Sequence, residues 1–361
     1  MSYGLYIHIP FCKHICAYCD FLKMVTFKKE TMEKYINRLI EEFREYEKYL
    51  SDIKTIYIGG GTPNALPLDL LEKLLKKIDE YNKNTCEYTI EINPELLTLS
   101  QIKLFKKYKI NRVSMGCEAM DDNILKLLGR HHKTYDIINA YKLLKDNGID
   151  NINLDFIYAN PWDNKDLVNS MIDKILELNP NHLSLYTLIL EDKTIFKYKN
   201  IKMLDEDTAS DLMDLVNERL KKAGYNHYEI SNYAKDGFEG VHNSIYWSSK
   251  EYIGLGMGAS GYLDSIRYDN EKTLNAYFSH FKANSCHLSV SDKKSEYLML
   301  GLRMKKGVSI SKYQELFNSS PIDDFDMEKL LKYELIKIDG DNIYMTYKGY
   351  KLGNVVFENF I

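Results

Sequence analysis

Short apolar segments alternate with longer amphipathic segments through the first two thirds of the chain, and this alternation constrains the fold more than any other feature. The longer segments have helical periodicity, as in 31–50, 68–81 and 135–148. The expected strands are 5–9, 54–58, 88–92, 111–115, 151–157 and 182–188. Strands joined by helices form a parallel sheet. Six such units predict an α/β fold built on an open (β/α)6 partial barrel rather than on a closed barrel of eight strands.

The strand–helix rhythm stops near residue 235, which divides the chain into three expected parts. Residues 1–235 form the barrel domain, and 236–290 form an irregular connecting region rich in Gly, Tyr, Asn and Ser. Residues 291–361 predict short helices and a hairpin with the turn "DGDN", a small winged-helix-like α+β module. A chain of 361 residues with 45% hydrophobic content is long enough to bury a large core beside a smaller one.

Charge argues against nucleic acid as a partner, although winged-helix modules often bind DNA. Residues 292–361 contain eleven Lys or Arg and eleven Asp or Glu, and the whole chain has a net charge of -4. Binding to phosphate backbones requires a basic surface. We therefore expect no nucleic-acid binding, and a packing or lid role for the C-terminal module.

The N-terminal sequence and the cysteine content predict a cytoplasmic protein. No signal-peptide pattern is visible, and no apolar run approaches the ~18 residues of a membrane span. Six cysteines in a long intracellular chain favour metal or redox use over a disulfide framework. Three of them are isolated and are expected to be buried free thiols: Cys86, Cys117 and Cys286.

The other three cysteines form the segment "CKHICAYC", with Cys12, Cys16 and Cys19 in a loop after the first strand. Thiolates select zinc, copper(I) or iron–sulfur clusters. A structural zinc ion needs a fourth ligand, which His8 or His14 could supply. A [4Fe–4S] cluster held by three cysteines would leave one iron with a free position. The spacing alone leaves both interpretations open.

Other polar or glycine-rich segments also follow expected strands. They are "GGGTPN" after 54–58, Glu91, "SMGCE" and Asp155. In barrel-like sheets the chemistry gathers at the carboxyl ends of the strands, so these residues are expected to converge with the cysteine loop. Glycines there let the backbone approach a ligand, and no Gly-Lys-Ser/Thr follows to make a phosphate loop.

The cysteine segment resembles the signature of radical S-adenosylmethionine (SAM) proteins, in which the open iron of a [4Fe–4S] cluster binds the amino and carboxylate groups of SAM. The wider sequence is similar to the oxygen-independent coproporphyrinogen III oxidase group over essentially the whole chain. The matching blocks are "LYIHIPFCKHICAYCDF", "IGGGTP", "IEINPE", "RVSMG", "LGRHH", "HLSLYTL", "HNSIYW", "GLGMGAS", "LGLRMKKGV" and "YKGYKLGN".

Three features favour the haem chaperone branch of this group over the true oxidases. Asp20 and Phe21 follow the motif where the oxidases carry another cysteine, the segment 242–247 fits H-N-x-x-Y-W, and the first strand begins near Met1. The chaperone reading implies haem or porphyrin as ligand and transfer to acceptor haemoproteins such as membrane respiratory subunits, which would place a monomer or homodimer at the inner face of the membrane. The alternative is oxidative decarboxylation of coproporphyrinogen III.

The resemblance also implies roles for individual residues, though it assigns none to catalysis. The cluster ligands would be Cys12, Cys16 and Cys19. The SAM contacts would be Tyr6, Tyr18, Gly60, Gly61, Thr62, Glu91, Glu118, Arg130, Asp155 and Ser260, with Glu91 accepting from the ribose hydroxyls. The haem contacts would be His242, Asn243, Tyr246 and Trp247, with His242 the best candidate ligand.

Structural alternatives accompany these roles. Tyr6 and Tyr18 could be core aromatics, and Arg130 and Asp155 could form an ion pair. The 242–247 segment could anchor an irregular region against the barrel. The sequence departs from the group at two places: Glu118 replaces Gln, and "IYANPWDN" (157–164) replaces Y-G-L-P-G. The resemblance therefore supports the cofactor contacts better than the substrate contacts.

Overall fold

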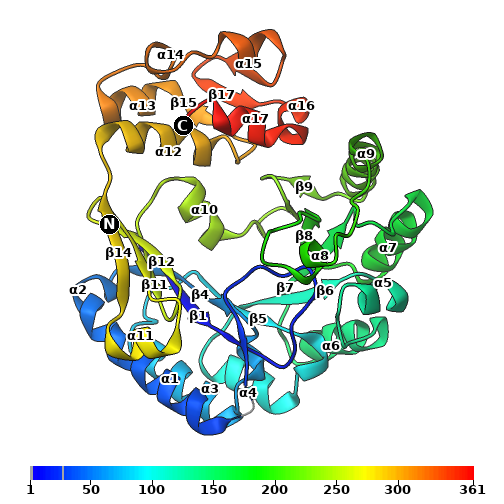
Figure 1. Ribbon diagram of the computed structural model, residues 1–361, viewed down its shortest axis with the longest axis vertical. Coiled ribbons are helices and arrows are strands. Elements are labelled where there is room, and N and C mark those ends of the chain that lie inside the picture. Colours follow the sequence, from blue (N-terminus) through cyan, green and yellow to red (C-terminus); the bar gives the residue numbers. More distant parts are fainter. Residues whose placement is uncertain (1–2, 27) are drawn as a thin grey trace.

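A sheet of twelve strands organises the computed structural model, which describes residues 3–26 and 28–361. Its centre consists of parallel strands that follow chain order and curve into an open barrel (Figure 1). These strands are β1 (Tyr3–Ile9), β4 (Ile53–Gly60), β5 (Glu87–Ile92), β6 (Arg112–Glu118), β7 (Asn151–Tyr158) and β8 (His182–Thr187). The six-stranded open barrel predicted from the sequence is confirmed, with each strand near its expected position.

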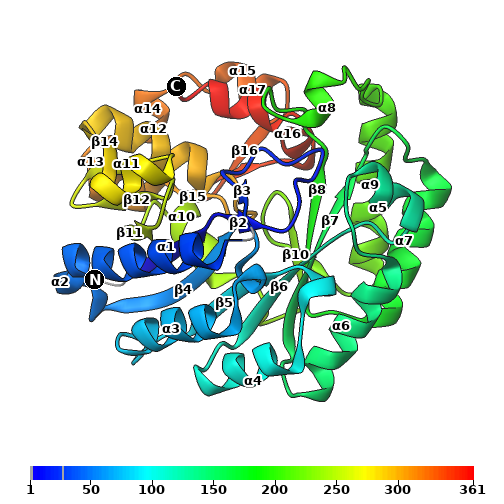
Figure 2. The same cartoon turned by 60° about the horizontal axis from the view of Figure 1, so that its bottom comes forward.

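Amphipathic helices cover the outer face of the barrel (Figure 2). They are α1 (Lys29–Glu42), α2 (Glu47–Leu50), α3 (Leu68–Asp79), α4 (Leu99–Lys107), α5 (Asp122–Leu127), α6 (Thr134–Asp146), α7 (Lys165–Leu178) and α9 (Glu206–Lys222). The short α8 (Ile195–Tyr198) lies beside the cysteine loop instead. In α3 the buried residues recur at helical spacing, from Leu70 to Ile78. Gly148 follows α6 with φ +76°, a conformation that suits glycine at a helix end.

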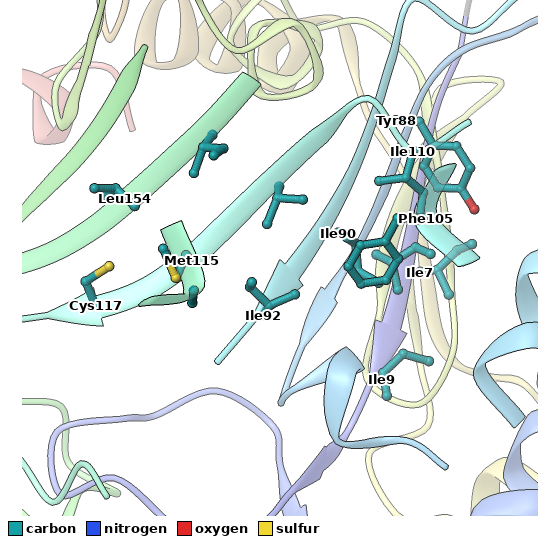
Figure 3. Packing of buried hydrophobic residues seen from close by; sticks show 14 of the residues in the cluster. Ile7, Ile9, Tyr88, Ile90, Ile92, Phe105, Ile110, Met115, Cys117 and Leu154 are labelled. Atoms are coloured by element: carbon teal, nitrogen blue, oxygen red, sulfur yellow. The ribbon is translucent and has the colours of Figure 1, made fainter. Parts of the chain in front are cut away.

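Alternation along the strands separates an apolar outer face from a polar interior. Ile90 and Ile92 of β5 pack outward with Phe105 of α4, and Met115 and Leu154 continue the same layer (Figure 3). Successive side chains of a strand point to opposite faces. The intervening positions, which include Tyr57, Glu91 and Asp155, therefore face the barrel interior, where a site can form.

Both edges of the barrel are extended by further strands. Beside β1 lie β11 (Tyr252–Leu255), which is parallel to it, and then the antiparallel β12 (Ser260–Leu263), β13 (Ile266–Asn270) and β14 (Lys282–His287). Beside β8 lie β10 (Asn232–Ala234) and β9 (Asn226–His227). The prediction that 236–290 is irregular is therefore wrong. These strands are hard to detect in the sequence because they contain glycine, which carries no strand signal. Glycine is required at position 254 because a Cβ there would meet the Ser260 carbonyl oxygen at 1.9 Å.

A buried carboxylate fastens this extension to the barrel helices. Glu42, at the end of α1, accepts hydrogen bonds from the Gly256 amide (2.8 Å), the Tyr277 hydroxyl (2.6 Å) and the Asn270 side chain (2.6 Å). Tyr277 belongs to α11 (Leu274–Ser279). Burial raises the pKa of Glu42 to about 7, against the opposing effect of these donors.

The C-terminal part has a hydrophobic core of its own. Its elements are α12 (Val290–Gly301), β15 (Val308–Ser309), α13 (Ile310–Phe317), α14 (Pro321–Asp324), α15 (Glu328–Lys332), β16 (Ile336–Asp339), β17 (Asn342–Met345), α16 (Tyr347–Lys351) and α17 (Gly353–Glu358). The predicted hairpin turn joins β16 and β17. Helix α10 (Val241–Trp247) lies between this part and the barrel, and it contacts α12, β1 and β4 (Figure 1). Among the described residues, no helix combines the length and apolar character that crossing a bilayer requires.

Candidate functional site

A cavity of about 440 Å³ opens at the carboxyl ends of the parallel strands. Most of the residues predicted to bind the cluster and SAM line it, so the sequence prediction that the strand ends converge matches the structure. These residues are Cys12, Cys16, Tyr18, Cys19, Gly60, Gly61, Thr62, Glu91, Glu118, Arg130 and Asp155.

The cysteine loop is held to the barrel by backbone hydrogen bonds. The Ala17 amide donates to the Leu128 carbonyl (3.0 Å), and the Ala17 carbonyl accepts from the Phe196 amide (3.1 Å). The short strands β2 (Phe11–Cys12) and β3 (Met24–Val25) pair at the two ends of the loop. The loop therefore has a defined conformation that directs its thiols to the cavity.

The donor set contains three thiols, the number that a [4Fe–4S] cluster with one open iron position requires. Cys12, Cys16 and Cys19 are free thiols on one cavity wall. In the described part of the chain, no three His, Cys, Asp or Glu side chains are close enough together to hold one metal ion. A zinc ion requires every sulfur within about 2.3 Å, whereas a cluster spans more widely separated thiols. Burial raises the pKa of Cys12 to about 11, so its ligation would release a proton.

The two histidines considered as a fourth zinc ligand are placed differently. His8 has both ring nitrogens occupied, by the Tyr6 hydroxyl (2.9 Å) and the Leu22 carbonyl (2.8 Å). The His14 ring stacks on His131 with centroids 3.9 Å apart. His8 therefore supports the loop rather than a metal.

Arg130 contributes a buried positive charge beside the cysteine loop. Its guanidinium donates to Asn93 Oδ1 (2.9 Å), to the Gly116 carbonyl (2.8 Å) and to Cys16 Sγ (3.5 Å), and it lies 3.8 Å from Glu118 Oε1. Burial lowers the pKa of Arg130, but the surrounding anions raise it overall, so the charge persists. The Arg130–Asp155 ion pair considered from the sequence does not form, because Arg130 pairs with Glu118.

Glu118 occupies a strained position at the cavity wall. It has φ +67° at an irregularity in the pairing of β6 and β7. Burial is the main cause that raises its pKa, and Arg130 opposes the shift. Burial, with Glu118 nearby, also raises the pKa of the Tyr18 hydroxyl. The acidic residue found in place of the group's Gln is thus compensated by Arg130.

Glu91 is the best-positioned carboxylate for a polar ligand. Its oxygens accept from the Tyr57 hydroxyl (2.8 Å) and the Gly60 amide (3.0 Å), and they border the cavity. Burial raises the pKa of Glu91 to about 7. Space here depends on glycine, because a Cβ on Gly59 would lie 2.8 Å from the Glu91 carboxyl and one on Gly60, at φ +109°, would meet the His8 ring at 2.5 Å.

Asp155 is held by short polar side chains rather than by a cation. It accepts from Ser114 Oγ (2.8 Å) and Asn153 Nδ2 (2.8 Å). Burial raises the pKa of Asp155. Together with Glu91 and Glu118, it gives the cavity lining three carboxyl groups, of which Glu118 is buried and the other two are half-buried.

Several predicted site residues lie outside the cavity lining. Tyr6 is half-buried beside His8, and Ser260 is exposed on β12, bonded to Asp269. The "IYANPWDN" segment contributes Ile157 to the lining, whereas Asn160, Asp163 and Trp162 form a local turn. Among the isolated cysteines, Cys117 is buried as expected, but Cys86 and Cys286 are exposed. Both stand near strand ends or edges, which the sequence did not reveal.

The predicted haem residues lie in α10, away from the cysteine loop. His242 is buried, with Nδ1 2.8 Å from Thr55 Oγ1 and Nε2 2.6 Å from the Tyr246 hydroxyl. Burial lowers its pKa to about 3, so the ring is neutral. The indole of Trp247 lies under the Arg303 guanidinium, 4.4 Å from the ring centroid.

Asn243 lines a second, small chamber of about 20 Å³ that adjoins the large cavity. The two spaces share four lining residues, Tyr57, Ser114, Asp155 and Tyr186. Tyr57, Tyr186 and Asn93 were given no role from the sequence, and Ser114 was expected to converge only as part of "SMGCE". Their signal was the inward position of alternate residues on expected strands, and the placement of Asn93 directly after Glu91 and Ile92.

Two family models match the sequence. The radical SAM superfamily model covers residues 6–175, and the HemN C-terminal domain model covers 288–352. The heme chaperone HemW of Lactococcus lactis is 40% identical over 99% of this chain and 96% of its own length. HemW of Bacillus subtilis is 33% identical, with coverages of 99% and 98%. Coproporphyrinogen III oxidase HemN from Escherichia coli shares the fold, with a TM-score of 0.87 over 99% of this chain and 90% of its own at 21% identity.

Proposed function

The chain belongs to the HemW family within the radical SAM superfamily, and we propose that it is a haem chaperone that binds haem and passes it to acceptor haemoproteins. The full-length similarity to curated haem chaperones carries this proposal. The absence of a further cysteine after Cys19, where Asp20 and Phe21 line the cavity mouth, supports it over the oxidase alternative.

We propose that Cys12, Cys16 and Cys19 hold a [4Fe–4S] cluster and that SAM occupies the rest of the cavity. When bound and reduced, such a cluster can supply an electron to SAM. The chain's own residues bind and orient. Glu91 offers carboxylate oxygens to ribose hydroxyls, the Gly60–Thr62 backbone allows close approach, and Arg130 places a positive charge 3.5 Å from Cys16 Sγ.

For haem, we propose that His242 supplies Nε2 to the iron and keeps the Nδ1 contact with Thr55. Metal-binding histidines usually use their second ring nitrogen for an orienting hydrogen bond, and Thr55 already provides one at 2.8 Å. The Tyr246 hydroxyl would then leave Nε2. Since α10 lies between the barrel and the C-terminal module, haem binding would require these two parts to separate locally.

Haem titration of the full chain tests the proposal. The wild type should develop a Soret band with one haem per chain, His242→Ala should lose the band, and Tyr246→Phe should keep it because Nε2 is freed. His287→Ala changes an exposed histidine on β14 and serves as the control. No Soret change in the wild type would refute the proposal.

The oxidase alternative is tested with the anaerobically reconstituted protein, SAM, reductant and coproporphyrinogen III. The proposal expects no tricarboxylic or dicarboxylic product. Formation of those products at catalytic rates would identify the chain as an oxidase instead.

A further inference from the structure

The interior faces of β4 and β5 connect the cofactor cavity to helix α10. Thr55, Tyr57 and Gly59 alternate on β4, while Glu87 and Glu91 lie four residues apart on β5. At ~3.3 Å per residue, this spacing is about 13 Å. The amino-terminal (lower) ends of the two strands contact α10, and their carboxyl-terminal (upper) ends border the cavity.

Two contacts fix α10 at the lower end. The Glu87 carboxylate accepts from the backbone amides of Val241 and His242, each at 2.8 Å, and Thr55 Oγ1 lies 2.8 Å from His242 Nδ1. The position of α10 is therefore tied to the same strands that present Glu91 and Gly60 to the cavity.

Tyr57 joins the two ends. Its hydroxyl donates to Glu91 Oε1 at 2.8 Å, and its ring stacks on His242 with centroids 5.2 Å apart and planes 29° apart. It lines both the large cavity and the small chamber that Asn243 borders. The chamber's 20 Å³ holds about one water molecule, and the ring is one of the four side chains that border both spaces.

The tyrosine ring packs closely against the β4 backbone on one side. A Cβ on Gly59 would come within 2.8 Å of its ring, so the side chain already fills the space beside that backbone. A change in the hydrogen bonding of Glu91 therefore acts on the ring, and the ring acts on His242. His242 passes the change to Tyr246 through the 2.6 Å contact at Nε2.

We infer that Tyr57 is a positioning residue that couples SAM binding at Glu91 to the conformation of α10. The inference rests on the proposed function, and it adds the residue through which the cofactor site controls the haem segment. SAM competes with the Tyr57 hydroxyl for the Glu91 carboxylate. The displaced or reoriented ring changes the stacking on His242. This in turn changes the positions of the Tyr246 and Trp247 side chains at the end of α10.

Trp247 reports this change without haem. The chain has two tryptophans, so Trp162→Phe leaves Trp247 as the single indole. In that background, anaerobically reconstituted full-length protein is titrated with SAM while emission of Trp247 is recorded, and equilibrium dialysis measures SAM binding on the same samples. SAM is expected to shift the emission, and adding Tyr57→Phe is expected to abolish the shift while dialysis still detects bound SAM.

Tyr88→Phe is the matched control, because its buried hydroxyl on β5 has no hydrogen-bond partner in the structure. It should retain the SAM-dependent shift. An equal shift in Tyr57→Phe, or no shift in the parent although SAM binds, would overturn the inference. No SAM binding in the parent would instead overturn the cofactor part of the proposed function, and dialysis separates that outcome from failure of the coupling.

Discussion

Arg130 and Glu118 face each other across 3.8 Å, and both side chains are almost completely removed from solvent. The pair lies between the cysteine loop and the strand ends, so its two charges define the electrostatics of the cavity wall. Removing one partner of a buried pair leaves the other charge uncompensated.

Arg130→Gln is therefore expected to destabilise the protein by about 3–5 kcal/mol. Adding Glu118→Gln should recover a large part of that loss, because no unpaired carboxylate then remains. Urea unfolding of the cluster-free protein measures both values. Simple additivity of the two single changes would show that the charges do not interact.

The cysteine loop gives a prediction about iron. Cys16→Ser should abolish the broad visible absorbance after anaerobic reconstitution and should lower the iron content, because it removes one of three thiols at the cavity. Cys86→Ser removes an exposed thiol outside the cavity and should leave both unchanged. A wild-type protein that carries one zinc ion and no iron would contradict the cluster assignment.

Glu42 predicts a pH dependence of stability. Its folded pKa of about 7 lies above the ordinary value of 4.5, so its contribution to stability is complete below pH 4.5 and is lost as the pH rises through 7. Between pH 4.5 and 8, the free energy of unfolding of the wild type should fall by roughly 3 kcal/mol relative to Glu42→Gln. The control variant is Glu41→Gln, which changes the exposed neighbour of Glu42. Its free energy of unfolding should depend on pH in the same way as that of the wild type. Parallel pH profiles for wild type and Glu42→Gln would refute the shift.

Gly60 tests how closely the backbone must approach its neighbours. Gly60→Ala combines a positive φ with a Cβ only 2.5 Å from the His8 ring, and it should cost about 3 kcal/mol or more. Gly237→Ala also has a positive φ, at +82°, but its Cβ meets nothing within 4 Å, so about 1 kcal/mol is expected. Thermal unfolding compares the two. Equal losses would show that backbone conformation alone requires glycine at position 60.

The barrel could be predicted because its strands and helices have opposite periodicities that are visible in the sequence. The strand ends then located the cysteine loop, Gly60–Thr62, Glu91, Glu118 and Asp155 in the cavity lining, but not its residues Tyr186–Ile189 and Glu191. The strands beside β1 could not be found in the same way. Gly254 and Gly261 are there because neighbouring backbone and rings approach closely, and glycine carries no strand signal.

Residue roles were harder to predict where they depend on partners distant in the sequence. Ser260 belongs to a matching block but lies on an exposed strand, bonded to Asp269. Arg130 was weighed against Asp155, yet the bend at Glu118 brings that carboxylate closer. Tyr57 received no role from the sequence, because its contacts with Glu91 and His242 join residues 34 and 185 positions away.

Two backbone hydrogen bonds attach Ala17, in the middle of the cysteine loop, to neighbouring segments of the protein. Ordering one residue costs about 1–2 kcal/mol of chain entropy. Because Leu128 and Phe196 bind Ala17 between Cys16 and Cys19, this residue is ordered when the protein folds and not when a cluster binds. The middle of the loop is therefore held in position by the protein itself, without a contribution from a bound cluster. We accordingly expect a cluster to be assembled on a loop whose middle is already attached to the barrel.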